Sequence, residues 1–349
     1  MFIEEYLKKD NNNLDLIRLI AALMVIIGHS YALAPAHGSR DVLSSLFGVM
    51  YSGAIAVAIF FFVSGLLVTN SLLSKKSPIE FIISRFFRIY PALVVVALIS
   101  VLVLGPIVTE HNLSNYFGSN MTILYLVDNL KINIGYYLPG VFIHNHFKDS
   151  VNGSLWTIPF EIKFYLFLLA FFLVGLFKNK IIATVFGFFI IFSPFYLPLF
   201  HPSNSEVYYL PVMFTLGSLL ALYKDKIIID SSLFFGGVLL TYLFKSYSVD
   251  SYNFMLHCTI GIGVLYISSL RYVKKVKIKY DISYGVYLYA WPVQQTLNFL
   301  YPEKNYLFNC IIAIIITIPL AFLSWILIEK KAIYIGKQLS IKFNRKSFS

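Results

Sequence analysis

Residues 51–73 read YSGAIAVAIFFFVSGLLVTNSLL, a run of 23 residues without a charged side chain. A helix needs roughly 20 apolar residues to cross a hydrocarbon layer of about 30 Å. Nine other stretches are as apolar or nearly so, two of them short for a span: residues 14–33, 89–108, 155–177, 181–200, 207–223 (short), 227–244 (short), 252–270, 282–300 and 307–328. The sequence therefore predicts an all-α integral membrane protein with about ten transmembrane helices.

The composition of the 349-residue chain agrees with a membrane protein. Hydrophobic residues make up 58% and charged residues 13%, with a mean hydropathy of +0.75, whereas a soluble domain has roughly 45–50% apolar and 25% charged residues. This composition excludes a water-soluble enzyme. The two cysteines, Cys258 and Cys310, lie in apolar stretches and define neither a disulfide framework nor a metal site.

The positive charges are distributed unevenly along the predicted helices and loops. With the N-terminus inside, 22 of the 28 Lys and Arg residues fall in inner segments, 5 fall in outer segments, and Lys163 lies within a stretch. Because cytoplasmic segments carry an excess of Lys and Arg, we expect both termini in the cytoplasm. The net charge of +11 then reflects orientation and contact with membrane lipids, so no nucleic-acid partner is expected.

The chain divides into a cytoplasmic N-terminal segment (1–13), a membrane domain (14–328) and a basic cytoplasmic tail (329–349). The membrane domain includes an outer loop of about 109–154, which is longer than most loops in compact domains. Apolar residues such as LPGVF at 138–142 predict that this loop is ordered, either re-entrant or packed over the helices. No internal repeat is visible, which weakens a transporter built from inverted repeats.

Two ionisable side chains in the first stretch are the leading candidates for a site. Arg18 and His29 are 11 residues apart, which places them on one helix face about 16 Å apart along the axis, and Asp15 shares the face of Arg18. Ionisable residues within membrane helices are costly and usually functional. The alternatives are a snorkelling lipid anchor for Arg18 and an interhelical hydrogen bond for His29.

A pair of arginines precedes the third stretch. Arg85 and Arg88 are three residues apart and share a helix face, where two guanidiniums suit a polyphosphate. The alternative is anchoring to lipid headgroups, which also carry phosphate.

The second and fourth stretches carry further polar candidates. Ser64 and Gly65 form either part of a site or a packing notch between helices. Glu161 lies about one turn into the fourth stretch and shares a face with Tyr165, whereas Lys163 points elsewhere. Glu161 is either functional or part of a structural ion pair.

An aromatic stripe runs along the ninth stretch. Tyr284, Tyr287 and Trp291 lie on one helix face, a pattern typical of packing and also of a ligand wall. No metal-ligand spacing, P-loop or nucleotide-binding glycine motif is present. The histidines apart from His29 are therefore assigned no ligand role: His37, His111, His144, His146, His201 and His257.

Several motifs, in this order, resemble those of the bacterial membrane acyltransferase 3 family. They are DLIR (15–18) followed by His29, FFVSG (61–65), RFFRIYP (85–91), LPGVF (138–142), VNGSLW (151–156) followed by Glu161, and SYGVYL (283–288). The resemblance extends from residue 10 to about residue 330. It implies transfer of an acyl group, usually acetyl, from cytoplasmic acetyl-CoA to a hydroxyl of an extracytoplasmic glycan such as O-antigen, capsule or exopolysaccharide, in polymer or lipid-linked form.

The resemblance also implies a place in the bacterial inner membrane and essential roles for Arg18 and His29, with acetyl-CoA as a substrate and no permanently bound cofactor. Two departures stand out. Many members have a histidine where this chain has Ala290, so no catalytic role is assigned there. Some members carry a C-terminal esterase-like domain, which this chain, ending at Ser349, is expected to lack. Any acyl relay would then finish within the helices or involve a partner protein.

The chemistry of such a transfer fits these residues. A hydroxyl that attacks a thioester needs a base, and histidine has the unperturbed pKa nearest neutrality. Direct transfer and an acyl-imidazole intermediate both satisfy this requirement. The candidates are thus catalytic (His29, Arg18, Glu161), donor-binding (Arg18, Arg85, Arg88, Ser64) and acceptor-binding (Trp156, Tyr165, Tyr284, Tyr287). The competing interpretation is a transporter or a flippase of lipid-linked glycan; a non-catalytic assembly partner would not explain Arg18 and His29 on one face.

Overall fold

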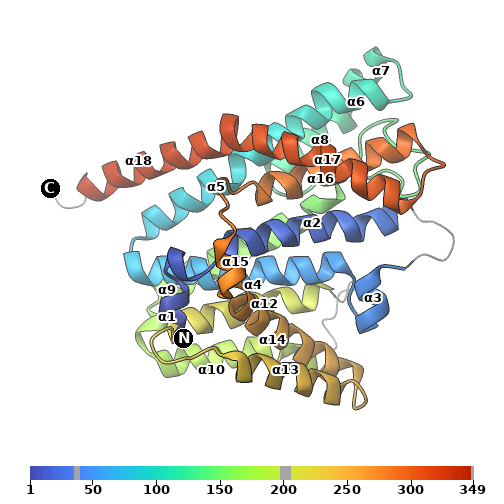
Figure 1. Ribbon diagram of the computed structural model, residues 1–349. Helices are drawn as coiled ribbons and strands as arrows, with labels where there is room; N and C mark the ends of the chain where they lie inside the picture. The colour runs from blue at the N-terminus through green and yellow to red at the C-terminus, as the bar shows by residue number, and fades with distance from the viewer. Residues whose placement is uncertain (35–39, 197–205, 347–349) are drawn as a thin grey trace. The chain divides into compact units, whose positions relative to one another are not determined.

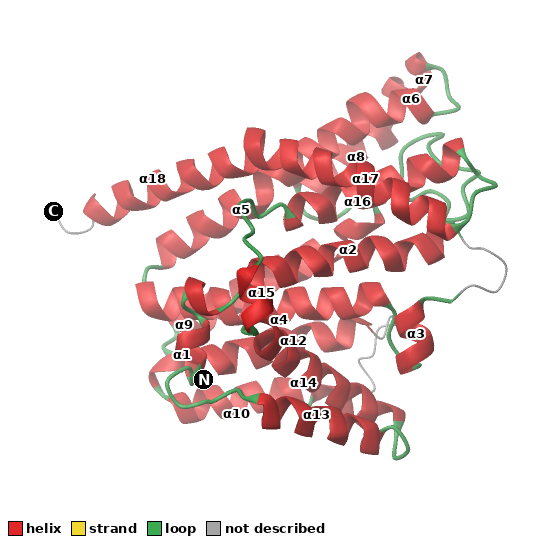
Figure 2. Ribbon diagram, in the orientation of Figure 1, coloured by secondary structure: helices red, strands yellow, loops and turns green. Residues whose placement is uncertain are grey.

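The computed structural model describes residues 1–34, 40–196 and 206–346, and over these ranges the chain is built from helices, turns and loops without a β-strand (Figure 2). Its contacts divide the chain into two compact units. Unit 1 comprises Met1–Ala21, Leu43–Pro78 and Glu161–Lys279, and unit 2 comprises Ala22–Val42, Ile79–Phe160 and Tyr280–Ser349. The prediction of an all-α chain is confirmed.

Unit 1 is arranged around α4 (Ser52–Lys75), which is buried over most of its length and packs along α12 (Glu206–Leu222) (Figure 1). The other elements of the unit are α1 (Ile3–Tyr6), η1 (Lys9–Asn11), the start of α2 (Leu14–Leu33), α3 (Val42–Phe47), most of α9 (Ile158–Leu173), η4 (Leu176–Lys178), α10 (Lys180–Ile191), α11 (Ser193–Tyr196), α13 (Ser231–Phe244), α14 (Val249–Ser268) and α15 (Arg271–Lys275).

Two glycines explain how closely α4 and α12 approach. A Cβ atom at Gly65 would lie 2.0 Å from the carbonyl oxygen of Phe214, and one at Gly217 would lie 2.2 Å from the carbonyl oxygen of Phe62. Only a residue without a side chain allows two helix backbones to meet at such distances. The packing notch considered for Gly65 is therefore present.

Unit 2 contains the two longest helical runs of the described chain. The first is α5 (Pro78–Ile99), continued by the π-helical η2 (Ser100–Leu104) and α6 (Gly105–Val108). The second is α17 (Tyr306–Ser324), continued by the π-helical η6 (Trp325–Glu329) and α18 (Lys330–Lys346). The remaining elements are the rest of α2, α7 (Leu113–Gly118), α8 (Asn120–Leu130), η3 (Gly153–Thr157) and α16 (Ser283–Leu300), which pairs with α17.

The outer loop predicted at 109–154 is ordered and has its own core in unit 2. Tyr116, Tyr125, Leu138 and Phe142 are almost completely buried and pack together. Burial raises the pKa of the Tyr125 phenol to about 12, so this ring is neutral at physiological pH. The polar side chains of the loop bond to α16, so the loop packs against this helix.

A proline in α16 creates one of these loop contacts. Pro292 has no N–H, so the carbonyl oxygen of Leu288, four residues earlier, lacks its usual helical donor. The side chain of Asn152 supplies that donor, with Nδ2 2.9 Å from the Leu288 oxygen. Asn145 adds a second contact, because its Nδ2 lies 2.8 Å from Oε1 of Gln295. The loop is thus hydrogen-bonded to α16 at two positions along the helix, Leu288 and Gln295.

Helices occur at all ten predicted stretches, but only five helical segments of the described chain are long and apolar enough to cross a membrane. These are Leu14–Leu33, Ser52–Lys75, Pro78–Val108, Gly153–Leu173 and Tyr306–Phe343. Three others, Lys180–Ile191, Val207–Leu222 and Ser231–Phe244, are apolar but shorter. The helix predicted for the fifth stretch, residues 181–200, is too long, because α10 ends at Ile191. Residues 197–200 of this stretch lie outside the described ranges. The five spans agree with a membrane protein.

Candidate functional site

The helix that carries the first candidates forms as expected. Arg18 and His29 both lie in α2, which runs without interruption from Leu14 to Leu33. The predicted spacing of the two side chains along one helix therefore stands. Arg18 is half-buried and belongs to unit 1, whereas His29 is 8% exposed and belongs to unit 2.

His29 is packed against an aromatic ring in unit 2. Its imidazole meets the Trp291 indole edge-on, with ring centroids 4.7 Å apart and planes inclined by 80°. Within the described ranges, the buried Nδ1 atom of His29 has no hydrogen-bond partner. A nitrogen in this state is available to hold or accept a proton from a bound group.

The Trp291 ring is itself fixed by the outer loop. Its Nε1 donates to the carbonyl oxygen of Ser150 at 3.0 Å, and Phe147 packs edge-on at 5.2 Å. A Cβ atom at Gly153 would lie 2.5 Å from the indole, so a glycine is required for the loop to reach this ring. The loop thus fixes the surface against which the His29 imidazole rests.

A buried amide cluster lies beside His29 and was missed in the sequence. Nε2 of Gln294 is 2.9 Å from the carbonyl oxygen of Ile26, 2.8 Å from Oγ of Ser30 and 3.1 Å from Oδ1 of Asn309. Gln294 is completely buried. The available signal was the presence of the amide side chains of Gln294 and Asn309 inside two predicted membrane stretches, where amides bond between helices.

Arg88 forms a second cluster in unit 2. Its Nη2 lies 2.7 Å from Oδ2 of Asp281, its Nη1 lies 3.6 Å from Oε2 of Glu329, and the guanidinium carbon is 5.7 Å from the centre of the Tyr284 ring. The Glu329 side chain is 1% exposed, although the prediction placed it in the cytoplasmic tail. Both ends of the Arg88 fork therefore already contact carboxylates.

The other predicted arginine lies one turn earlier on the same helix. Arg85 is half-buried and its Nε lies 3.5 Å from Oγ of the adjacent Ser84. Arg85 and Arg88 share α5, as their spacing predicted.

Three predicted residues meet in unit 1. The Tyr165 hydroxyl donates to Oε1 of Glu161, one turn earlier on α9, and lies 2.8 Å from Oγ of Ser64 on α4. Lys163, between Glu161 and Tyr165 in the sequence, is exposed. The arrangement joins α4 to α9 through a chain of three polar side chains.

The aromatic candidates have structural partners. The Tyr287 hydroxyl bonds to the carbonyl oxygen of Ser154 at 2.5 Å and lies 2.7 Å from Oγ1 of Thr157. The Tyr284 hydroxyl donates to the carbonyl oxygen of Ile89 at 3.0 Å. Trp156 is half-buried and packs edge-on against Phe160. The two tyrosine hydroxyls of the stripe thus have hydrogen-bond partners within the protein.

The predicted residues are divided between the two units. Unit 1 contains Arg18, Ser64, Glu161 and Tyr165, and unit 2 contains His29, Arg85, Arg88, Trp156, Tyr284 and Tyr287. Over the described residues, no group of three or more His, Cys, Asp and Glu side chains could hold a metal ion.

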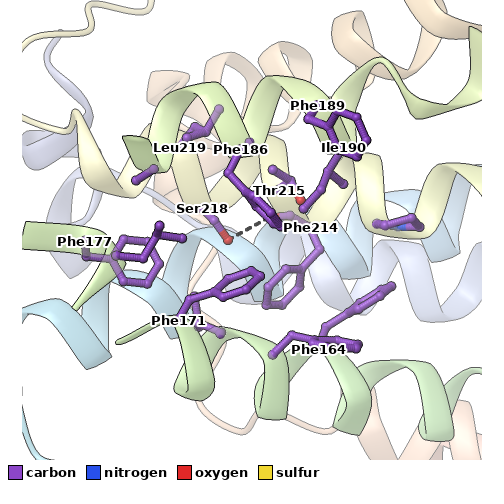
Figure 3. A pocket seen from close by; sticks show the side chains of 16 residues that line it. Phe164, Phe171, Phe177, Phe186, Phe189, Ile190, Phe214, Thr215, Ser218 and Leu219 are labelled. Atoms are coloured by element: carbon purple, nitrogen blue, oxygen red, sulfur yellow. Dashed lines mark hydrogen bonds between the residues drawn. The ribbon is translucent and has the colours of Figure 1, made fainter. Parts of the chain in front are cut away.

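An apolar cavity of about 310 Å³ lies within unit 1, between α9, α10 and α12 (Figure 3). Phenylalanine rings surround it, and the Ser218 hydroxyl on its wall is bonded to the Phe214 carbonyl oxygen at 2.9 Å. None of the predicted site residues lines this cavity, and its walls suit hydrocarbon instead of acyl-transfer chemistry.

Comparisons with known proteins identify the family. The Acyl_transf_3 family, described as an acyltransferase domain, matches residues 11–329. The O-acetyl transferase of Shigella phage Sf6 is 29% identical over 338 residues, which cover 92% of this chain and 96% of that protein. Nodulation protein 10 of Rhizobium leguminosarum bv. viciae is 27% identical in an alignment that is 374 residues long and covers 96% of each chain. No solved structure matches. The chain therefore belongs to the Acyl_transf_3 family and is an acyltransferase.

Proposed function

We propose that this protein is a membrane-embedded O-acetyltransferase that moves an acetyl group from cytoplasmic acetyl-CoA to a hydroxyl of an extracytoplasmic glycan, such as O-antigen, capsule or exopolysaccharide. The observation that carries the proposal is the buried His29, whose Nδ1 has no partner within the described ranges, in a chain of the acyltransferase family. The relative named O-acetyl transferase supports acetyl as the acyl group and oxygen as its destination.

His29 performs the proton transfer in the proposed reaction. The acceptor hydroxyl oxygen attacks the thioester carbonyl carbon while His29 accepts the hydroxyl proton. The carbon–sulfur bond then breaks, and the coenzyme A thiolate takes the proton from His29. An acyl-imidazole on His29 would divide the same exchange into two steps.

The remaining candidates are assigned from their chemistry. Arg18, Arg85, Arg88 and Ser64 are proposed donor contacts, since guanidiniums and a hydroxyl suit the phosphates of coenzyme A. Glu161 is a proposed catalytic carboxylate, and its bond from Tyr165 supports a fixed orientation. Trp156, Tyr165, Tyr284 and Tyr287 are proposed acceptor contacts.

The proposed membrane arrangement has ten transmembrane helices with both termini in the cytoplasm of a bacterial inner membrane. The 22-to-5 distribution of Lys and Arg and the helices at all ten stretches support it. A cytoplasmic donor and an external acceptor would then have to meet within the membrane.

The test uses purified full-length protein in detergent, radiolabelled acetyl-CoA, and surface polysaccharide isolated from a strain that lacks the gene. We expect saturable acetyl-CoA binding and base-labile label on the polysaccharide. A flippase or transporter would bind no acetyl-CoA, and that result would refute the proposed function.

A further inference from the structure

Near Trp291 in unit 2, three residues each have a buried polar atom without a hydrogen-bond partner. Within the described residues these atoms are Nδ1 of His29, Oγ of Ser154 and Oε1 of Gln294. The His29 ring contacts the indole, Ser154 follows the Gly153 that meets it, and Gln294 lies one turn further along α16. Buried polar groups in proteins are almost always paired, so the unpaired atoms of these three residues indicate a polar ligand.

The orientation of the Gln294 amide is fixed by its partners. Nε2 lies 2.8–3.1 Å from three acceptors, Ile26 O, Ser30 Oγ and Asn309 Oδ1, which share its two N–H donors. A flipped amide would direct its oxygen at the Ile26 carbonyl, which cannot donate. The side chain of Asn309 is oriented in turn, because its Nδ2 donates to the backbone carbonyl oxygen of Gln294 at 2.9 Å. The unpaired atom of Gln294 is therefore its oxygen, which is a hydrogen-bond acceptor.

The same contacts hold Gln294 beside His29. Ser30 directly follows His29 on α2, and Ile26 lies one turn before Ser30. On α16, Trp291 contacts the His29 ring while Gln294, three residues later, bonds to these neighbours. Trp291 and Gln294, in one turn of α16, thus both contact the segment of α2 that carries the proposed base.

We infer that Gln294 is an acceptor-binding residue of the acyl transfer, an inference that rests on the proposed function. While His29 takes the proton of the attacking hydroxyl, Oε1 of Gln294 accepts a hydrogen bond from a second hydroxyl of the same acceptor. This selects substrates with neighbouring hydroxyls, which are characteristic of sugars, and rejects simple alcohols. A buried site built to bond a hydroxyl discriminates against molecules that lack it.

The adjacent residue provides a matched control. Gln295 is also completely buried in α16, but both ends of its amide are paired. Its Nε2 donates to the carbonyl oxygens of Phe147 and Ser150 at 2.7 and 2.9 Å, and its Oε1 accepts from Asn145 at 2.8 Å. Gln294→Met and Gln295→Met remove the same groups from neighbouring positions of one helix.

The experiment measures the apparent KM for polysaccharide isolated from the deletion strain and the KM for acetyl-CoA, normalised to folded protein. Gln294→Met should raise the polysaccharide KM about tenfold and leave the acetyl-CoA KM unchanged. Gln295→Met leaves its loop partners unpaired and should lower the folded yield, while both KM values of its folded fraction stay within about twofold. Equal effects of the two substitutions would overturn the inference. A rise confined to the acetyl-CoA KM would also overturn it, because the oxygen would then bind an amide N–H of the donor.

A conservative variant guards against misfolding. The protonated side chain of the Gln294→Glu variant has the same length as glutamine and keeps one donor for Ile26 and one acceptor oxygen. The polysaccharide KM of this variant should therefore stay within about threefold of wild type. A tenfold rise in that KM for folded Gln294→Glu would contradict the role of the oxygen. If the wild type transfers no acetyl to the polysaccharide, the proposed function fails and this inference falls with it. Transfer by the wild type with no difference between Gln294→Met and Gln295→Met refutes the inference alone.

Discussion

His29 is the residue on which the proposed chemistry depends most. Its ring is held edge-on against Trp291, and its Nδ1 has no partner within the described ranges. His29→Ala should lower polysaccharide acetylation by about 10²–10⁴-fold, the usual effect of removing a general base. Base-labile acetate on the isolated polysaccharide is the readout, at matched membrane abundance. Wild-type turnover by a normally expressed variant would refute the role.

Substitutions of Arg88 can distinguish donor binding from a purely structural role, because its carboxylate partners are known. A lysine keeps the charge and loses the forked donor geometry, so Arg88→Lys should raise the apparent KM for acetyl-CoA. Arg88→Ala should raise it further, by roughly tenfold per 1.4 kcal/mol of lost binding. If Arg88 serves only to pair Asp281 and Glu329, the folded yield of both variants should fall while the KM stays constant.

Asp281→Asn supplies the control for this pair of outcomes. It weakens the 2.7 Å ion pair without removing a proposed phosphate contact. If Arg88 binds the donor, this variant should not raise the acetyl-CoA KM, since the guanidinium loses a competitor. A KM that rises equally in Asp281→Asn and Arg88→Lys would assign the whole effect to the structural ion pair.

The residues that sequence reasoning identified are those whose geometry is local. The spacing of Arg18 and His29 in one helix, and of Glu161 and Tyr165 in another, follows from helical periodicity alone. Gln294 was missed because its role depends on Ile26, 268 positions away. Asp281 and Glu329 were missed for the same reason, since Arg88 is 193 positions from Asp281. Periodicity carries no information on such distant contacts.

At the scale of elements, the bond between the outer loop and α16 gives a prediction about stability. Asn152→Ala leaves the Leu288 carbonyl oxygen without its donor, because Pro292 cannot provide one. An unsatisfied buried carbonyl costs about 1–3 kcal/mol, so the midpoint of thermal unfolding in detergent should fall.

A second substitution tests whether this carbonyl is the cause. Pro292→Ala restores a backbone N–H four residues after Leu288, so the double variant Asn152→Ala/Pro292→Ala should regain part of the lost stability. The gain should exceed that of Pro292→Ala in the wild-type background. Additive effects of the two substitutions would show that the loop contact does not act through the Leu288 oxygen.

Hydropathy predicted where helices occur better than where they end. The predicted stretch 181–200 contains a helix that ends at Ile191, and the stretch 307–328 continues through η6 into α18. Helix ends depend on caps and on hydrogen-bond register. Asn179 caps α10 by accepting from Ile181 and Ile182, whereas the π-helical turn at Trp325–Glu329 keeps α17 continuous with α18. A hydropathy average registers neither feature.

At the scale of the whole molecule, family membership and orientation rest on different observations. The family match covers residues 11–329 and so includes every candidate residue. Orientation rests on the Lys and Arg distribution and on the number of helices that cross the membrane. Five helical segments of the described chain are long and apolar enough to do so, and the ten-helix arrangement requires the shorter and more polar helices to cross as well.

Reporter fusions test this arrangement directly, since an even number of crossings places both termini on one side. Because 22 of 28 basic residues lie in the proposed inner segments, a C-terminal alkaline phosphatase fusion should be inactive and a fluorescent protein fusion at the same junction should be bright. Fusions after Lys131, in the turn that ends α8, should give the reverse, because this loop is proposed to be external. An active C-terminal phosphatase with an active loop fusion would mean an odd number of crossings and would refute the ten-helix arrangement. If the phosphatase fused to the loop is inactive and the fluorescent protein fused there is bright, the loop lies in the cytoplasm. The loop that fixes Trp291 would then not face the proposed external acceptor.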